Sequence, residues 1–293
     1  MGWLLEAKPL NILISYAYVS EGLIKELVEI NNTHPDTLRV FLDSGAFSAF
    51  NLKKEIRIED YCSFISSLPF KPWRYIALDV IGDEKKTKEN YIEMLDRGFD
   101  PVPVFTYGAD WKDVDFYYQR SDFVCMGGLV GERGSAKVVN DISKFIQIAD
   151  GRKTHLLGYT NLEYIKKFRP FSCDSSSWLQ CQRYGRLAVY MGNGRMKTID
   201  RKELIKNPSE EIKAALRLMG IDIQLLKYKK YITGWRVKGE GSIAQRATTL
   251  SWVKLTTEME KNIGTKMFLV CADKTNVLQI FNEYKQLENM EVI

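Results

Sequence analysis

Residues 40–48 read Val40-Phe41-Leu42-Asp43-Ser44-Gly45-Ala46-Phe47-Ser48. An apolar run ends at an aspartate, and small residues follow at once, as expected where a buried strand breaks into a turn. A strand that ends in this way carries its last side chain out of the sheet, and glycine lets a ligand approach the backbone closely. Several other apolar runs finish in the same manner, so this stretch indicates a repeated plan of strands with functional turns.

Eight short apolar runs rich in strand-forming residues recur in the first 195 residues. They cover residues 11–16, 39–43, 74–80, 101–107, 122–128, 154–159, 168–173 and 187–191. Amphipathic segments lie between most of them, at 21–30, 58–68, 85–97, 136–149 and 162–167. Alternation of strands with helices predicts a parallel sheet, and eight such units favour a (β/α)8 TIM-like barrel over an open doubly wound sheet.

A second unit is expected after the barrel. Residues 193–206 are polar, and the pattern beyond Pro208 becomes helical over 210–219 and 223–231. We therefore expect a barrel over residues 1–200 and a mainly helical or mixed C-terminal extension over 201–293. Residues 227–246 interleave basic and aromatic side chains, which is typical of nucleic-acid sites and also of ordinary amphipathic helices.

Composition favours a globular protein whose catalytic groups are carboxylates. Apolar residues make up 45% and charged residues 27% of the 293 residues. The five cysteines are scattered, and two histidines leave little material for a zinc site, so we expect neither a metal nor another cofactor. No apolar stretch reaches the roughly 20 residues of a membrane span, and the start lacks the features of a secretion signal. We expect no membrane partner and a cytoplasmic location. The oligomeric state stays open.

Basic residues are concentrated in one part of the chain. The net charge is +5 overall, but residues 152–206 contain twelve Lys or Arg and four Asp or Glu, a local net charge of +8. A basic surface of this kind suits a polyanion such as nucleic acid, and a solvated basic face is the alternative.

Three aspartates stand at the ends of predicted strands: Asp43, Asp79 and Asp174. The fifth strand ends in Gly127-Gly128-Leu129, where bare backbone amides can contact a flat ligand. Taken singly, an aspartate after a strand is more often a helix N-cap or a turn former than a catalytic group. Together, the three aspartates and the glycine element indicate a functional site more specifically than any one of them does alone.

In order and context these motifs resemble the tRNA-guanine transglycosylase superfamily, barrel enzymes that exchange a guanine in nucleic acid for a 7-deazaguanine. The family has Asp-Ser-Gly-Gly-Phe-Gln where this chain has Asp43-Ser44-Gly45-Ala46-Phe47-Ser48. Its Gly-Gly-Leu followed by Gly-Glu is matched by Gly127-Gly128-Leu129 and Gly131-Glu132. Its nucleophilic aspartate and Arg-x-Gly element resemble Asp174 and Arg183-Tyr184-Gly185, and Asp79 falls where the family has a base-recognising aspartate.

The chain departs from the tRNA enzymes in three respects. Ser48 replaces glutamine, no glutamine follows the fourth strand, and the zinc-binding Cys-x-Cys-x2-Cys element is missing. With its shorter length, the chain is more similar to the phage-type members that insert 7-deazaguanines into DNA. The resemblance thus implies DNA and a free preQ0-like 7-deazaguanine base as partners, with tRNA as the alternative nucleic acid.

The resemblance also implies a role for each residue. Asp174 would attack C1′ to form a covalent glycosyl-enzyme intermediate, and Asp43 would protonate the departing base and deprotonate the incoming one. Asp79 would accept hydrogen bonds from the N–H edge of the base. The expected substrate-binding residues are Asp79, Ser44, Gly45, Phe47, Gly127, Gly128, Leu129 and Tyr107, and the expected nucleic-acid-binding residues are Arg183, Arg186 and Arg195.

Other interpretations of the same residues remain open. Phe47 and Tyr107 could stack on the base, although aromatic residues are more often buried in a core. His155 is expected to be a hydrogen-bonded core residue, and Cys173 is expected to serve in packing. A glycosidase or nucleoside hydrolase could use the same carboxylates with water as acceptor. A noncatalytic nucleic-acid-binding subunit is the alternative outside enzymes, but such a protein needs none of the three aspartates.

Overall fold

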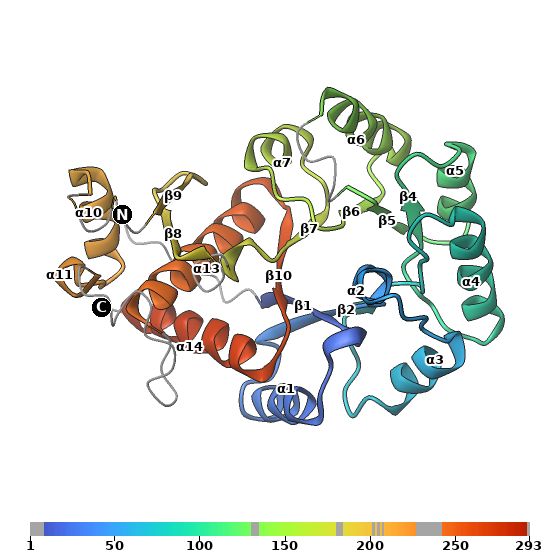
Figure 1. Ribbon diagram of the computed structural model, residues 1–293, viewed down its shortest axis with the longest axis horizontal. Coiled ribbons are helices and arrows are strands. Elements are labelled where there is room, and N and C mark those ends of the chain that lie inside the picture. The colour runs from blue at the N-terminus through green and yellow to red at the C-terminus, as the bar shows by residue number, and fades with distance from the viewer. Residues whose placement is uncertain are drawn as a thin grey trace. The chain divides into compact units, whose positions relative to one another are not determined.

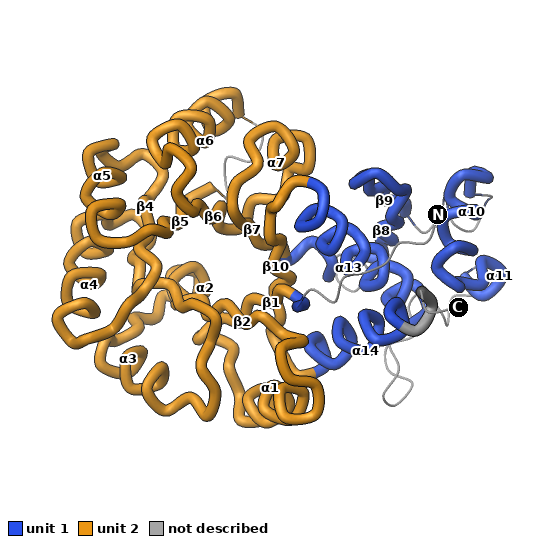
Figure 2. The backbone as a smooth tube through the Cα atoms, turned by 180° about the vertical axis from the view of Figure 1, so that it is seen from behind, with its two compact units in different colours: residues 1–10, 176–262, 275–293 blue, residues 11–175, 263–274 orange. Residues whose placement is uncertain are grey.

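The computed structural model describes residues 9–129, 135–179, 184–200, 203, 206, 208–226 and 242–291. The chain divides into two compact units, which Figure 2 distinguishes by colour. The sheet unit contains residues 11–175 and 263–274, and the helical unit contains residues 1–10, 176–262 and 275–293. This division differs from the expected boundary at residue 200 in two ways: residues 176–200 belong to the helical unit, and the chain returns to the sheet unit for residues 263–274.

The sheet unit is built on eight strands in one curled sheet, with helices around it (Figure 1). The strands are β1 (Leu10–Ser15), β2 (Leu38–Asp43), β3 (Arg74–Tyr75), β4 (Val104–Thr106), β5 (Phe123–Gly127), β6 (Lys153–Leu156), β7 (Ser172–Ser175) and β10 (Lys266–Cys271). Their order is β3-β2-β1-β10-β7-β6-β5-β4, with parallel pairing. A further parallel bridge joins Ile76, just after β3, to Val102, just before β4.

Helices connect successive strands of the sheet. They are α1 (Glu21–Thr33), α2 (Ala46–Leu52), α3 (Ile58–Ser67), α4 (Glu84–Asp96), α5 (Lys112–Tyr118), α6 (Ala136–Ala149) and α7 (Leu162–Phe168), with a short 3-10 turn η1 (Tyr16–Tyr18) after β1. Ser20, Asp83, Ser135 and Asn161 cap four of them by accepting backbone N–H groups of the first turn. The cap at Asp83 shows a polar residue that starts a helix just after a strand segment.

The core of the sheet unit fills the inside of the curled sheet. It consists of side chains contributed by many strands: Leu13, Phe41, Ile76, Val102, Val104, Phe123, Cys125 and Phe268. Phe41 packs against Phe123 and Phe268 with ring centroids 6.0 and 5.3 Å apart. Such a filled interior leaves the ends of the strands as the place for a site.

The expected eighth strand at residues 187–191 is wrong as a member of this sheet. Its residues form β8 (Arg186–Tyr190), which pairs antiparallel with β9 (Met196–Asp200) in a separate two-stranded sheet. Gly192, Asn193 and Gly194 all have positive φ and make the tight turn between them. A short turn can join antiparallel strands, whereas parallel strands need a long crossover. The eighth strand of the large sheet is instead β10, which pairs with β1 and β7.

The helical unit confirms the expected C-terminal helices. It contains η2 (Ser177–Leu179), α10 (Glu210–Leu218), α11 (Ile223–Leu226), α13 (Ile243–Ile263) and most of α14 (Lys274–Glu291). Arg246 of α13 donates to Glu283 and Gln286 of α14 at 2.9 and 2.7 Å. Most of the basic and aromatic stretch at 227–246 lies outside the described residues. No helix in the described segments is long and apolar enough to cross a membrane.

Candidate active site

Three aspartates lie at one edge of the parallel sheet. Asp43 is the last residue of β2, Asp174 belongs to β7, and Asp79 follows β3 by four residues. Because parallel strands all end at the same edge, the three side chains converge there although they are far apart in sequence. The charges of Asp79 and Asp174 both raise the pKa of Asp43, and all three raise the pKa of the buried Cys125 thiol.

The turn after β2 holds Asp43 by local contacts. The Gly45 amide donates to Asp43 Oδ2 at 2.9 Å. Gly45 has φ +85°, and a Cβ at this position would lie 2.9 Å from both the backbone N and the Cβ of Ala17. Glycine is therefore required for the backbone conformation and also for the close approach. Gly45 is also the N-cap residue of α2, so the turn joins the carboxylate directly to that helix.

Burial raises the pKa of Asp43 to about 7, and the negative charge of Asp79 is the second cause. The Gly45 amide and the Ser15 hydroxyl oppose the rise, although Ser15 Oγ does not reach the geometry of a full hydrogen bond. A carboxyl group with this pKa can both give and take a proton near neutral pH. This is the property that general acid and base catalysis needs.

Asp79 is held by the same turn. The buried Ser44 hydroxyl donates to Asp79 Oδ1 at 2.7 Å, which links the end of β2 to the segment after β3. Burial raises the pKa of Asp79, and this hydrogen bond opposes the rise. Ser44 thus positions Asp79, and its expected contact with the substrate stays a prediction.

Asp174 is held by a different set of contacts. The Gly158 amide donates to Asp174 Oδ1 at 2.7 Å, and His155 Nε2 lies 3.2 Å from the same oxygen. The Oδ2 atom has no hydrogen-bond partner among the residues that the structure describes. With Oδ1 fixed in place, Oδ2 is the oxygen left for a reacting atom.

His155 is a fully buried histidine that the sequence did not connect with Asp174. Its Nδ1 lies 2.8 Å from the Ser172 hydroxyl, and its ring stands edge-on to Phe41 at 5.0 Å. Because a carboxylate only accepts hydrogen bonds, Nε2 is the ring nitrogen of His155 that donates to Asp174. The expectation of a hydrogen-bonded core residue is confirmed, and one of its partners is Asp174. The signal in the sequence is that residues 155 and 172–174 lie on successive strands, which places them side by side.

The glycine-rich end of β5 packs against the end of β4. Gly128 has φ +80°, and a Cβ there would lie 3.1 Å from the Cβ of Tyr107. The Tyr107 amide donates to the Gly127 carbonyl at 3.0 Å, and Leu129 is fully buried. Tyr107 itself is half-buried, with Lys137 Nζ 5.6 Å from the centre of its ring. These glycines therefore allow the two strand ends to meet closely.

Phe47 is exposed and does not belong to the core. Its exposed fraction is 52%, and it lies in the first turn of α2, four residues after Asp43. The core interpretation is therefore wrong for Phe47. About half of its surface is therefore open to contact with a ligand.

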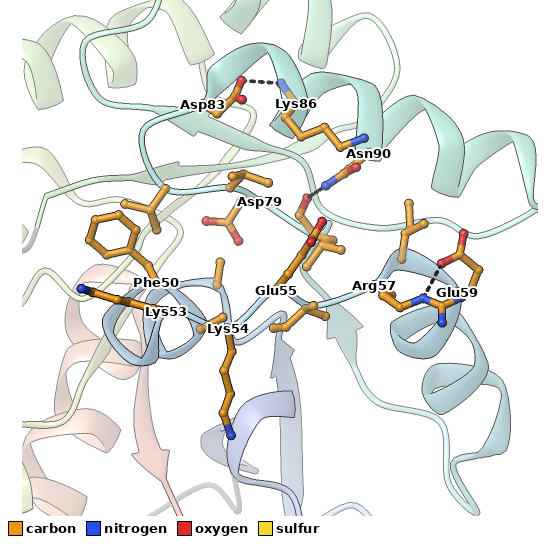
Figure 3. Close-up of a pocket in the computed structure, with 17 residues that line it drawn as sticks. Phe50, Lys53, Lys54, Glu55, Arg57, Glu59, Asp79, Asp83, Lys86 and Asn90 are labelled. Carbon is orange, nitrogen blue, oxygen red and sulfur yellow. Dashed lines mark hydrogen bonds and ion pairs between the residues drawn. The ribbon is translucent and has the colours of Figure 1, made fainter.

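A cavity of about 720 Å³ opens beside Asp79 (Figure 3). Its walls come from α2, the connection to α3, the segment after β3 and the start of α4. Asp79 contributes to its lining, whereas Asp43 and Asp174 do not. No sequence pattern indicates this cavity, because it depends on how two connections lie against each other.

Two of the arginines expected to bind nucleic acid, Arg186 and Arg195, belong to the helical unit. Arg186 begins β8 and is exposed, and Arg195 lies in the turn before β9, where its Nη2 is 3.8 Å from Glu211 Oε1. Arg183, Gly131 and Glu132 lie outside the described residues. Their roles stay predictions.

The described residues contain no group of three or more His, Cys, Asp or Glu side chains arranged to hold a metal ion.

Burial raises the pKa of Cys173 well above its ordinary value, which suits its expected role in packing.

Comparisons with known proteins give no relative for this chain: no family model, curated protein or solved structure matches it.

Proposed function

We propose that this chain is a nucleic-acid guanine transglycosylase, which exchanges guanine in DNA for a free 7-deazaguanine base. The observation that carries the proposal is the pairing of two carboxyl groups with different surroundings at one edge of the sheet. Asp43 has a pKa raised to about 7, whereas Asp174 accepts two hydrogen bonds on one oxygen. Carboxyl groups placed in contrasting environments are the usual basis for dividing acid–base and nucleophilic roles.

In the proposed reaction Asp174 Oδ2 forms a bond to C1′ of the target nucleotide as the C1′–N9 bond to guanine breaks. The transition state resembles an oxocarbenium ion, which a nearby carboxylate stabilises. Asp43 gives its proton to the departing guanine. The incoming 7-deazaguanine then loses a proton to Asp43 and displaces Asp174 from C1′, so the two displacements retain the configuration of the sugar.

Asp79 has the position and chemistry to recognise both bases. Guanine and 7-deazaguanine present the same N–H edge, and a carboxylate accepts from two neighbouring donors. Ser44 holds Oδ1 of Asp79 at 2.7 Å, which would keep the carboxylate oriented during the exchange of bases. A closed (β/α)8 barrel of the TIM type is part of the proposal, and the Ile76–Val102 bridge supports it.

The proposal is tested by incubating the protein with guanine-labelled DNA or tRNA and free 7-deazaguanine bases. We expect release of labelled guanine from DNA that depends on the added base. Release of label without an added base would identify a hydrolase. Release from tRNA alone would make tRNA the substrate, and release from neither under any condition would contradict base exchange.

His155 provides a prediction about the positioning of Asp174. His155→Leu removes the donor to Oδ1, and we expect the exchange rate constant kcat to fall about 10²-fold because the nucleophile loses its orientation. His155→Gln keeps an N–H donor and should retain most of the activity. Steady-state kinetics would show the loss in kcat with little change in KM for the free base.

A purely structural role for His155 would give a different result. In that case both variants would lose stability in urea unfolding, and Gln would not restore kcat. Equal activity of His155→Leu and the natural protein would also contradict the positioning role.

A further inference from the structure

The short helix α2 exposes three large apolar side chains. Phe47, Phe50 and Leu52 have exposed fractions of 52%, 59% and 60%. Nearly half of the large apolar side chains that are exposed in the described residues therefore belong to this one helix, which begins three residues after Asp43. The others are Tyr18, Ile92, Tyr184 and Leu218.

The cavity beside Asp79 lies along this helix. Its volume of about 720 Å³ falls within the range of about 300–1,000 Å³ that is typical of small-molecule sites. In Figure 3, Phe50 stands at one side of the cavity, and the carboxylates of Asp79 and Glu55 turn toward the space between α2 and α4. An aromatic wall with carboxylate acceptors suits a flat ring that carries N–H donors.

Two lysines at the end of α2 have no ion-pair or hydrogen-bond partner for their ammonium groups within the described parts of the chain. Lys53 is the C-cap residue of α2 and Lys54 follows it, and the ammonium ends of both side chains extend away from the cavity (Figure 3). Arg57, in contrast, lies 3.6 Å from Glu59. Lys53 and Lys54 thus hold their charges outside the cavity, whereas Asp79 and Glu55 turn their carboxylates into it (Figure 3). Arg57 and Lys86 are the other cations in the lining.

We propose that α2, together with Lys53 and Lys54, binds the nucleotide next to the reacting one in an unpaired nucleic-acid strand. Its base would stack on the exposed ring of Phe50, which leaves Asp79 to the base that is exchanged, and its phosphates would contact the two lysines. Stacking on an aromatic ring beside cations is how single strands are bound without sequence preference. That this nucleic acid is also the substrate rests on the proposed function.

The chemistry favours nucleic acid over a protein partner. A stable protein interface needs about 800 Å² on each side, and lysine is depleted in the core of such interfaces. The exposed apolar surface on α2 is limited to one short helix and ends at two lysines. Phosphates are the partners that complement those charges.

The test measures binding of a short fluorescein-labelled single-stranded DNA by fluorescence anisotropy, without added base. Phe50→Ala should weaken binding about tenfold, and Phe50→Trp should keep it, because tryptophan also stacks. Lys53→Glu and Lys54→Glu should each weaken binding and reduce its dependence on salt by about one phosphate contact. Matched controls are Leu218→Ala, an exposed apolar residue of the helical unit, and Lys71→Glu, an exposed lysine before β3.

Failure of this inference is distinguishable from failure of the proposed function. Unchanged binding by Phe50→Ala and Lys53→Glu would overturn the inference even if base exchange occurs. If these variants bind DNA more weakly but the natural protein exchanges no base, α2 is a nucleic-acid-binding surface and the proposed function is wrong. If sedimentation shows that Phe50→Ala abolishes self-association and leaves DNA binding intact, α2 is a protein contact and the inference is wrong.

Discussion

Asp174→Asn is expected to abolish base exchange, with a loss of about 10⁴-fold or more. The amide has the size of the carboxylate and keeps an oxygen that can accept from the Gly158 amide, so the fold should be preserved. It cannot, however, form the bond to C1′ that holds the sugar between the two displacements. The measurement is base-dependent release of labelled guanine from DNA.

A second measurement separates loss of the nucleophile from loss of substrate binding. The natural protein should form a covalent complex with DNA that survives denaturation, and Asp174→Asn should not, while its DNA affinity stays within a few-fold of the natural value. Asp150→Asn is the matched control, because Asp150 is exposed and has φ +47°, a conformation that asparagine tolerates. Base exchange by Asp174→Asn within tenfold of the natural rate would contradict the mechanism.

Asp43→Asn is expected to slow base exchange by about 10²–10⁴-fold, because the departing guanine loses its proton donor. In the natural protein, kcat/KM for DNA should fall as the pH rises above about 7, since the first displacement needs protonated Asp43. The variant should lack this titration. A pH profile that is the same for both proteins would show that Asp43 is not the acid.

The same substitution should increase stability at high pH. The pKa of Asp43 is about 7 in the folded protein and about 3.9 in an unfolded chain, so between these values the folded state binds the extra proton. The free energy of unfolding therefore decreases as the pH rises from about 4 to about 7, by up to about 4 kcal/mol. Asparagine does not titrate and avoids this loss.

Urea unfolding at pH 5 and pH 8 checks the stability prediction. The difference in unfolding free energy between Asp43→Asn and the natural protein should favour the variant more at pH 8 than at pH 5. Asp79 also has a raised pKa and titrates in both proteins, so the difference between them reports Asp43 together with its interaction with Asp79. Asp150→Asn serves again as the control and should follow the natural protein. A difference that does not change with pH would contradict the raised pKa.

Much of the sheet could be predicted from local patterns. Runs such as 39–43 and 122–128 alternate with amphipathic helices, and each becomes a strand of the parallel sheet. The run at 187–191 is also a strand, but the apolar pattern does not predict which strand it pairs with. The positive φ values at Gly192, Asn193 and Gly194 direct it into a hairpin, and β10 takes the vacant place between β1 and β7.

The sequence by itself determined the strand–helix alternation and the positions of Asp43, Asp79 and Asp174 near the carboxyl ends of strands, because short-range periodicity and turn residues act over a few residues. Only the tertiary structure decided which atoms meet: Ser44 with Asp79, His155 with Asp174, and α2 with the cavity beside Asp79. These contacts join segments that are 19 to 35 residues apart in the two hydrogen-bonded pairs. The geometry of these contacts depends on the order of the strands in the sheet, and the raised pKa of Asp43 depends on burial. Neither the strand order nor the burial is encoded in any local pattern.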